Sequence, residues 1–171
     1  MLISTSRKPS QNTRKFCKNL KHATGSEYVN RGKSSIRDIL LKSAVSGNDS
    51  TALVYEIKGN PSKITFYSRA KEVLSILVTV KTQNTRLHIN PDNLTVKCDV
   101  PRLSILAELL GGDLEDNPKD NYLYIHEYTD QDEDEYIEKD YVDYKIAIID
   151  FYNKKGEKLD LQIAVRKILD I

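Results

Sequence analysis

Strand-like and helix-like apolar patterns alternate over residues 1–47 of this chain, and three strand-like runs then follow one another. Leu2–Thr5 and Glu27–Asn30 are typical of short strands. A helix is predicted between these two strands and another after them, because apolar residues recur there at helical spacing. Alternation of strands and helices favours an α/β fold, in which helices cover the faces of a sheet.

Both predicted helices have recognisable ends. The first begins after Ser10, a good N-cap, and ends at Gly25, the residue type that most often terminates a helix. The second begins after Ser34 or Ser35 and ends at Gly47. The predicted buried sides consist of Thr13, Phe16, Cys17, Leu20 and Ala23 in the first helix and Ile36, Ile39, Leu40 and Ala44 in the second.

Three strand-like runs follow the second helix. Ala52–Ile57 and Ile64–Tyr67 flank the turn residues 59–62 and are predicted to form a hairpin. Val73–Val80 is rich in β-branched residues and is predicted to be a further strand. The order of elements in the first half is therefore βαβα followed by βββ.

The second half shows a similar order after a polar linker at residues 81–93. Its predicted elements are a strand at Leu94–Cys98, a helix from Pro101 to Leu110, a strand at Tyr122–His126 and a hairpin from Tyr144 to Val165. Because the order repeats, we predict an α/β fold with mixed sheets, built from two similar halves. The predicted halves are residues 1–86 and 87–171, which together form one domain.

Charge divides the chain at the same point. Residues 1–86 carry 16 Lys and Arg against 5 Asp and Glu, a net charge of +11, whereas residues 87–171 carry 10 against 20, a net charge of −10. The sum is the net charge of +1 of the whole chain. Such asymmetry points to nucleic acid, or to an oppositely charged protein, as a partner. Mutual neutralisation of the two halves is the alternative explanation.

Composition also predicts the compartment. No stretch approaches the roughly 18 apolar residues that a membrane span needs, and the N-terminal residues become polar and basic too early for a signal peptide. Cys17 and Cys98 lie far apart in the sequence and are predicted to be free thiols of a reducing compartment. We therefore expect a cytoplasmic protein with no membrane partner.

Cations gather where the two predicted helices begin. Arg7 and Lys8 precede the first helix, whose first turns hold Arg14 and Lys15 but no Asp or Glu. This arrangement opposes the usual preference for acids at a helix N-terminus, unless an anion is bound there. The second helix has a similar start, with cations before it and Arg37 in its first turn.

We therefore predict that both helix starts bind the phosphate backbone of RNA, with affinity but no sequence readout. A solubilising basic surface is the alternative. The predicted RNA-binding residues are Arg7, Lys8, Ser10, Arg14, Lys15, Lys18, Arg31, Lys33 and Arg37.

No catalytic, cofactor or metal constellation is predicted. Residues 32–34 resemble the end of a phosphate-binding loop, but the Gly that this motif needs five residues earlier is Glu27. Asp130–Glu135 alternates like a calcium loop, but Glu135 stands where Gly is required, so a solvated acidic loop is predicted. The three histidines lack metal-ligand spacing. We predict that the chain is not an enzyme and takes no cofactor or small-molecule substrate.

Four aromatic residues in predicted strands of the first half could stack on unpaired RNA bases, but their place in strands predicts that most of them pack in the core. They are Tyr28, Tyr55, Phe66 and Tyr67.

Three stretches of the first half form an ordered set: Thr5–Ser10 with Phe16 and Leu20 after it, Asn30–Gly32 with a helix soon after it, and Glu56–Pro61 at the hairpin turn. This set resembles the Brix-domain ribosome-biogenesis proteins, most closely their archaeal Imp4-like branch. The second half is similar to this family only in length and element order.

The resemblance implies a fold similar to two copies of the anticodon-binding domain of class II tRNA synthetases. It also implies binding to precursor rRNA, and some relatives promote pairing of a guide RNA with it. Arg7 and Lys8 fall in the family's Ser-Arg-x-Pro-Ser segment, and Arg31 in its Asn-Arg-Gly segment. Two segments of eukaryotic relatives have no match here: residues 68–71 replace a Gly-Pro-Thr, and residues 144–171 lack a Gly-Pro-Arg-Phe.

Together these observations predict a non-enzymatic, rRNA-binding factor of ribosome biogenesis that acts in pre-rRNA processing and assembly as an RNA binder or chaperone. Its expected partners are precursor rRNA, a guide RNA and ribosomal proteins. The alternative is a scaffold that docks basic ribosomal proteins on its acidic half.

Overall fold

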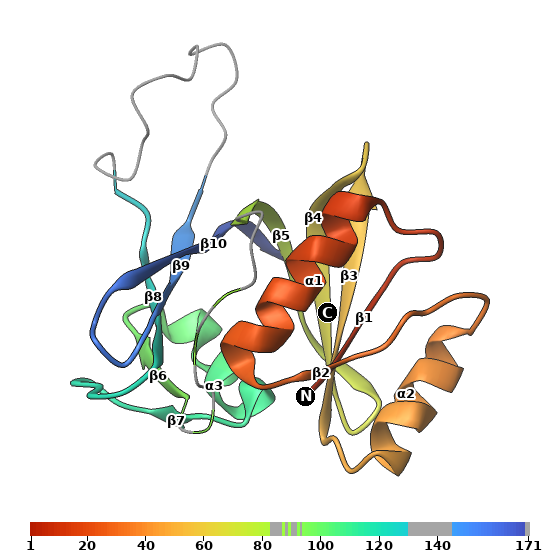
Figure 1. The fold of residues 1–171 in the computed structure, drawn as a ribbon, viewed down its shortest axis with the longest axis horizontal. Coiled ribbons are helices and arrows are strands. Elements are labelled where there is room, and N and C mark those ends of the chain that lie inside the picture. The colour runs from red at the N-terminus through yellow and green to blue at the C-terminus, as the bar shows by residue number, and fades with distance from the viewer. Residues whose placement is uncertain (83–86, 88, 90–91, 93, 130–144, 170–171) are drawn as a thin grey trace.

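The strands predicted from the sequence join into one mixed sheet (Figure 1). The computed structural model describes all residues of the chain except 83–86, 88, 90–91, 93, 130–144 and 170–171. The elements of the first half are β1 (Leu2–Thr5), α1 (Gln11–Thr24), β2 (Glu27–Tyr28), α2 (Ile36–Val45), β3 (Ser50–Ile57), β4 (Asn60–Ser68) and β5 (Lys71–Thr82). Those of the second half are β6 (Thr95–Cys98), a 3₁₀ turn (Pro101–Leu103), α3 (Ile105–Leu110), β7 (Asp113–Leu114), β8 (Tyr122–Glu127), β9 (Ala147–Tyr152) and β10 (Lys158–Leu169).

The same topology occurs twice in the ten-stranded sheet. Its strand order is β2-β1-β3-β4-β5 in the first half, continued by β10-β9-β8-β6-β7. The last strands of the halves, β5 and β10, pair antiparallel at the centre, from Leu161 opposite Thr82 to Leu169 opposite Ser75. The prediction of two similar halves in a mixed α/β fold is confirmed. The predicted boundary at residues 86 and 87 borders residues outside the described part and stays a prediction.

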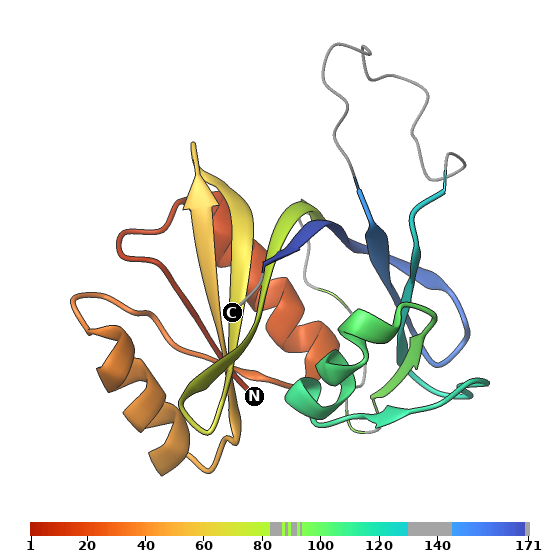
Figure 2. The same ribbon diagram turned by 180° about the vertical axis from the view of Figure 1, so that it is seen from behind.

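Helices α1 and α2 lie on opposite faces of the first half's strands (Figures 1 and 2). Alternate residues of a strand point to opposite faces, and Ile3 packs with α1 whereas Leu2 packs with Ile39 of α2. The helices lie on opposite faces because the two crossover connections run in opposite directions along the sheet. The connection from β1 moves outward to β2, and the connection from β2 returns past β1 to β3. Right-handed crossovers in opposite directions place their helices on opposite faces.

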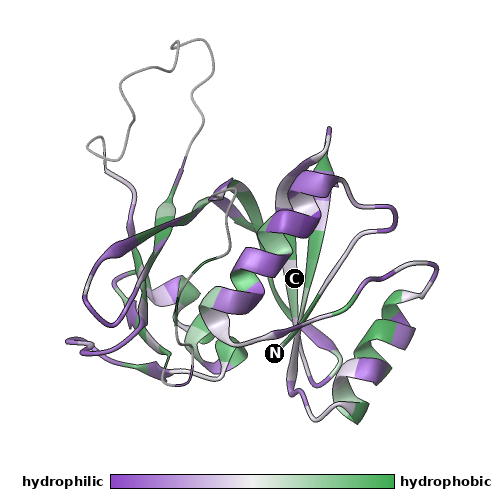
Figure 3. Cartoon of the chain, in the orientation of Figure 1, coloured by the Kyte–Doolittle hydropathy of each residue, from purple (hydrophilic) through white to green (hydrophobic). Residues whose placement is uncertain are grey.

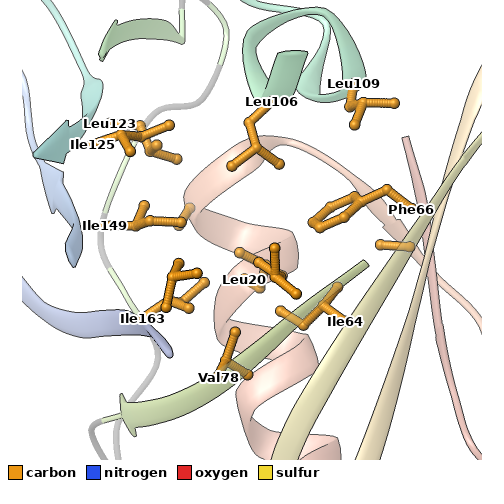
Figure 4. Close-up of a cluster of buried hydrophobic side chains, with 14 of the residues drawn as sticks. Leu20, Ile64, Phe66, Val78, Leu106, Leu109, Leu123, Ile125, Ile149 and Ile163 are labelled. Atoms are coloured by element: carbon orange, nitrogen blue, oxygen red, sulfur yellow. The ribbon is translucent and has the colours of Figure 1, made fainter. Parts of the chain in front are cut away.

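One hydrophobic core joins the two halves. Leu20 of α1, Ile64 and Phe66 belong to the same buried cluster as Leu106 of α3 and Ile149 (Figure 4). Helix α1 has a hydrophilic side and a hydrophobic side, and the hydrophilic side is turned outward (Figure 3). Because the halves share their core, they form one folded unit.

Several local predictions need correction. The first hairpin turns at Lys58 and Gly59 rather than at residues 59–62, so Asn60 and Pro61 already belong to β4. Both turn residues have positive φ, 50° and 80°, and such two-residue turns match the twist of paired strands. The two-residue strand β7 was not predicted, since it is too short to show a period. The predicted hairpin start at Tyr144 lies outside the described residues.

The buried side of α2 also differs from the prediction. Ala44 is exposed, and Ser43 is buried instead. The Ser43 hydroxyl accepts a hydrogen bond from the Thr51 hydroxyl (2.8 Å) and lies 3.4 Å from the carbonyl of Ser50, to which it donates. A buried polar residue that is satisfied by a neighbouring strand cannot be told from a surface serine by periodicity alone.

The shared core predicts that the halves unfold together. We expect Leu106→Ala, at a side chain only 2% exposed, to lower the free energy of unfolding by about 2–5 kcal/mol, because it leaves a cavity between the halves. The measurement is urea denaturation followed by circular dichroism. Leu41→Ala, at an exposed leucine of α2, is the control and should change stability by less than about 0.5 kcal/mol. Two separate unfolding transitions would contradict a common core.

Candidate nucleic-acid interface

The loops after β1 and β2 diverge from adjacent strand ends. These strands are parallel, with Leu2 opposite Glu27 and Ile3 opposite Tyr28. Since α1 and α2 lie on opposite faces, residues 6–10 and 29–35 lead away from each other and leave a crevice at the carboxyl edge of the sheet. In open α/β sheets, ligands bind in crevices of this kind.

A hollow of about 750 Å³ occupies this position. Five of its eight lining residues are cations, and none is an acid. We call it the basic hollow; its lining residues are Arg7, Lys8, Pro9, Arg14, Asn30, Arg31, Gly32 and Lys33. The structure thus brings together cations that the sequence places before two different helices. Pro9 and Asn30 were not predicted as site residues, since neither carries a charge that would single it out.

Four of the five cations are exposed: Arg7, Lys8, Arg14 and Lys33. Within the described part of the chain, none of these four side chains forms a salt bridge. Their charges are therefore available to an anion from solution, and several cations around one hollow reinforce each other's attraction for it.

Arg31 differs from the other four cations. It is only 8% exposed, and its guanidinium donates from Nε to the carbonyl of Ser34 (3.1 Å), with a longer contact of 3.4 Å from Nη1 to the carbonyl of Thr5. These bonds tie the loop before α2 to the end of β1. Arg31 therefore shapes the hollow as well as adding positive charge at its wall.

Each loop contains one residue of the hollow with left-handed backbone conformation. Gly32 has a φ of 55° and Lys8 a φ of 53°. Glycine adopts this conformation without cost, whereas a lysine loses roughly 1 kcal/mol or more. Position 8 thus keeps a cation where a glycine would be more stable.

Ser10 and Glu56 form the start of α1. The Ser10 hydroxyl accepts a hydrogen bond from the Thr13 amide (3.2 Å), and the Glu56 carboxylate accepts from the Ser10 amide (2.9 Å) and the Thr13 hydroxyl (2.5 Å). The anion that the first turn of α1 lacks in the sequence is therefore supplied by β3. The repulsion between the helix N-terminus and Arg14 is offset inside the protein, which the sequence analysis did not foresee.

Ser10 also fixes the first hairpin in place. Its hydroxyl donates to the carbonyl of Gly59 (2.7 Å). Among its described contacts, Ser10 acts as a helix cap and anchor; its predicted contact with RNA stays a prediction. Two of the stretches that carry the family resemblance, residues 5–10 and 56–61, are thus in contact with each other.

Three further predicted site residues lie outside the lining of the hollow. Lys18 is exposed and Lys15 half-buried on α1, and Arg37 is exposed in the first turn of α2. Ser35 is the N-cap of α2 and forms a capping box with Asp38. These three cations extend positive charge beyond the hollow, and their role in binding stays a prediction.

The equivalent loops of the second half carry the opposite charge. Asp99 follows β6, and Glu115 and Asp116 follow β7, in the loops that correspond to residues 6–10 and 29–35 of the first half. Among the described residues, the corresponding loops of the second half therefore do not form a second basic hollow.

Other kinds of site are not seen among the described residues. No group of three or more His, Cys, Asp or Glu side chains there is placed to hold a metal ion. None of the helices in the described ranges combines the length and apolar character needed to cross a bilayer. Both cysteines are free thiols, as predicted, and burial raises the pKa of Cys17.

Comparison with known proteins identifies the relatives of the chain. It is 48% identical over 66 residues to a probable Brix domain-containing ribosomal biogenesis protein of Methanothermobacter thermautotrophicus. It is 34% identical over 83 residues to a protein of the same description from Archaeoglobus fulgidus. The chain is thus similar, over less than half of its length, to archaeal Brix-domain proteins. These matches span 40% and 51% of the relatives' own lengths, and no protein-family model matches the chain.

Solved structures extend the similarity to nearly the whole length of this chain. The crystal structure of Mil, an archaeal Imp4-like protein, matches with a TM-score of 0.71 and 26% identity over 99% of both chains. A probable ribosomal biogenesis protein from Aeropyrum pernix has the same fold, with a TM-score of 0.70 and 19% identity. The predicted resemblance to the archaeal Imp4-like branch is confirmed.

The contact between Glu56 and α1 predicts a pH dependence of stability. Desolvation raises the pKa of Glu56, but hydrogen bonds from Thr13 and Ser10 outweigh it and leave this pKa below the usual 4.5. A carboxyl group whose pKa is lowered by folding stabilises the protein above its unfolded pKa, and this stability is lost as the pH falls through the folded pKa.

We therefore expect Glu56→Gln to reduce the free energy of unfolding at pH 7, and the difference from wild type to shrink below a pH of about 4.5. Urea titrations at several pH values would measure it. Glu27→Gln, at an exposed carboxylate of β2, is the control. A loss of stability that stays constant down to a pH of about 2 would contradict the role of the Glu56 charge.

Proposed function

We propose that this protein, which is similar to archaeal Brix-domain proteins, is a ribosome biogenesis factor that binds precursor rRNA and catalyses no reaction. The observation that carries the proposal is the basic hollow, where four exposed cations, three from two loops and Arg14 from α1, line one crevice. The names of the archaeal relatives, which describe ribosomal biogenesis proteins, support the biological setting.

Phosphate groups are the natural ligands of such a hollow. Arginine and lysine bind phosphate oxygens by charge-assisted hydrogen bonds, and an RNA backbone presents a phosphate at each nucleotide. Contacts of this kind give affinity and strong salt dependence but little sequence specificity. The left-handed backbone at Lys8 is consistent with this role, because the cation is kept at a cost in stability.

The proposed mechanism is that of an RNA chaperone in pre-rRNA processing and assembly. The basic hollow would hold the backbone of a folded or partly unpaired segment, and release it when other contacts replace the phosphates. A guide RNA or a ribosomal protein is a further partner under this proposal. We also propose a cytoplasmic location, in keeping with the two free thiols.

A protein scaffold is the second candidate, favoured by the net charge of −10 of residues 87–171. Basic ribosomal proteins are the partners that this charge would attract. Pull-downs from RNase-treated extract separate the two candidates. Loss of the main partners after RNase supports the RNA binder, whereas their survival supports the scaffold.

Replacing three exposed cations of the basic hollow tests the proposal. We expect Arg7→Ala, Lys8→Ala and Lys33→Ala together to weaken binding to a pre-rRNA fragment by at least about tenfold at low salt, because three phosphate contacts are lost. The slope of log affinity against log salt should fall by about 2. Arg31 is left in place because its backbone hydrogen bonds hold the loops.

A matched control removes the same number of positive charges elsewhere. Lys42, Lys71 and Lys167 are exposed and lie outside the basic hollow. Replacing these three by Ala should leave the salt slope closer to that of wild type. If both triple variants lose equal affinity, binding depends on net charge alone and the hollow is not the site.

A further inference from the structure

The outer face of the second half's strands carries aromatic side chains. Along β8, Leu123 and Ile125 are buried in the common core, whereas Tyr122, Tyr124 and His126 alternate with them and are partly exposed. Because alternate residues point to opposite faces, these three rings lie on the side of the sheet away from the core. None of them belongs to a described core cluster.

The repeated topology shows what is unusual about this face. In the first half, Leu53 of β3 lies opposite Ser4 of β1 and is fully buried, in one cluster with Ile39 of α2. In the second half the equivalent pair is Tyr124 opposite Lys97. Residues 115–121, between β7 and β8, contain no helix that corresponds to α2. The second half thus has rings and a cation on a face that the first half covers.

The rings are already arranged for stacking. Tyr122 and Tyr152 are parallel, with centroids 4.6 Å apart and an interplanar angle of 4°. The Tyr124 hydroxyl donates to a carboxylate oxygen of Asp99 (2.6 Å), and the Lys97 ammonium lies 4.9 Å from the centroid of the Tyr124 ring. The orientation of the rings is therefore fixed before any ligand binds, which lowers the entropic cost of binding.

Two lysines lie close to the stacked Tyr152 in the sequence. The turn between β9 and β10 follows Tyr152 directly and carries Lys154 and Lys155, both exposed. Two carboxylates of these strands and their turn have partners. Glu157 accepts a hydrogen bond from the Asn153 amide group (2.8 Å), and Asp150 is 2% exposed and lies 3.0 Å from the Lys158 ammonium.

We propose that this face binds unpaired nucleotides of RNA. We call it the tyrosine face and define it by Tyr122, Tyr124 and Tyr152 with Lys97, Lys154 and Lys155. Bases stack on tyrosine rings regardless of sequence, and lysines beside them hold the backbone. Two carboxylates of this face are already engaged, because Asp150 is buried and paired with Lys158 and Asp99 accepts a hydrogen bond from Tyr124, and this disfavours an arginine-rich peptide as the ligand.

The inference rests on the proposed RNA-binding function but names a separate site with a different preference. The basic hollow adjoins β1 and β2 in the first half, whereas the tyrosine face adjoins β8 and β9, on the other side of the β5–β10 pairing (Figure 1). One molecule can therefore hold a backbone segment at one site and an unpaired segment at the other.

The test compares two labelled RNA probes by fluorescence anisotropy, an eight-nucleotide oligouridine and a blunt duplex. We expect Tyr122→Leu with Tyr124→Leu to weaken oligouridine binding by at least about tenfold, because base stacking is lost, and to leave duplex binding unchanged. Tyr122→Phe with Tyr124→Phe retains the rings and should bind like wild type. Lys154→Glu with Lys155→Glu should weaken oligouridine binding even if the leucine variant fails to fold, with Lys42→Glu and Lys71→Glu as the control.

The outcomes separate this inference from the proposed function. If the leucine and glutamate variants bind oligouridine like wild type while the basic-hollow variants lose RNA, the tyrosine face is overturned and the proposed function stands. If the basic-hollow variants bind both probes like wild type and the leucine variant loses oligouridine binding, the tyrosine face stands and the basic hollow is overturned. Binding of an arginine-rich peptide that is lost in the leucine variant, with oligouridine binding unchanged, would overturn the inference in favour of a protein partner.

Discussion

The antiparallel pairing of β5 with β10 is the interaction on which the rest of the structure depends. Each half alone would end in a long strand with an unpaired edge, which is a site for unwanted association. Pairing the two edges removes both and brings the inner faces of the halves over one core, where Leu20 and Phe66 meet Leu106 and Ile149. The basic hollow and the tyrosine face are thereby held on a continuous sheet.

The two halves repeat one topology but carry different side chains at corresponding places. This difference accounts for their opposite net charges. At the carboxyl edge of the sheet, the first half places Arg7 and Lys33, and the second half places Asp99 and Glu115. On the outer face, the buried Leu53 of one half corresponds to Tyr124 of the other. Corresponding loops and strands thus carry unlike side chains, so the twofold repetition of the fold does not repeat its surface.

The sequence predicted most elements, because their periods and caps are local. Ser10 and Gly25 bound α1 as expected, and the repeated element order led to the two halves. It also identified the cations of the basic hollow, although not their grouping, which depends on the crossover directions of β1 and β2.

Contacts between distant residues were beyond such reasoning. The bonds of Glu56 to Ser10 and Thr13, and the burial of Arg31 against backbone carbonyls, leave no local pattern. The charge count pointed to the basic half for RNA, and therefore drew attention away from the tyrosines of the acidic half.

The cap of α1 has a consequence for the order of events during synthesis. Ser10 depends on acceptors at Glu56 and Gly59, which lie 46 and 49 positions further along the chain. A ribosome that has made only the first helix has not yet made its counter-charge. The cationic loop at residues 6–10 acquires its final shape only once the following hairpin has emerged, so the basic hollow arises with tertiary structure and not with the basic segment itself.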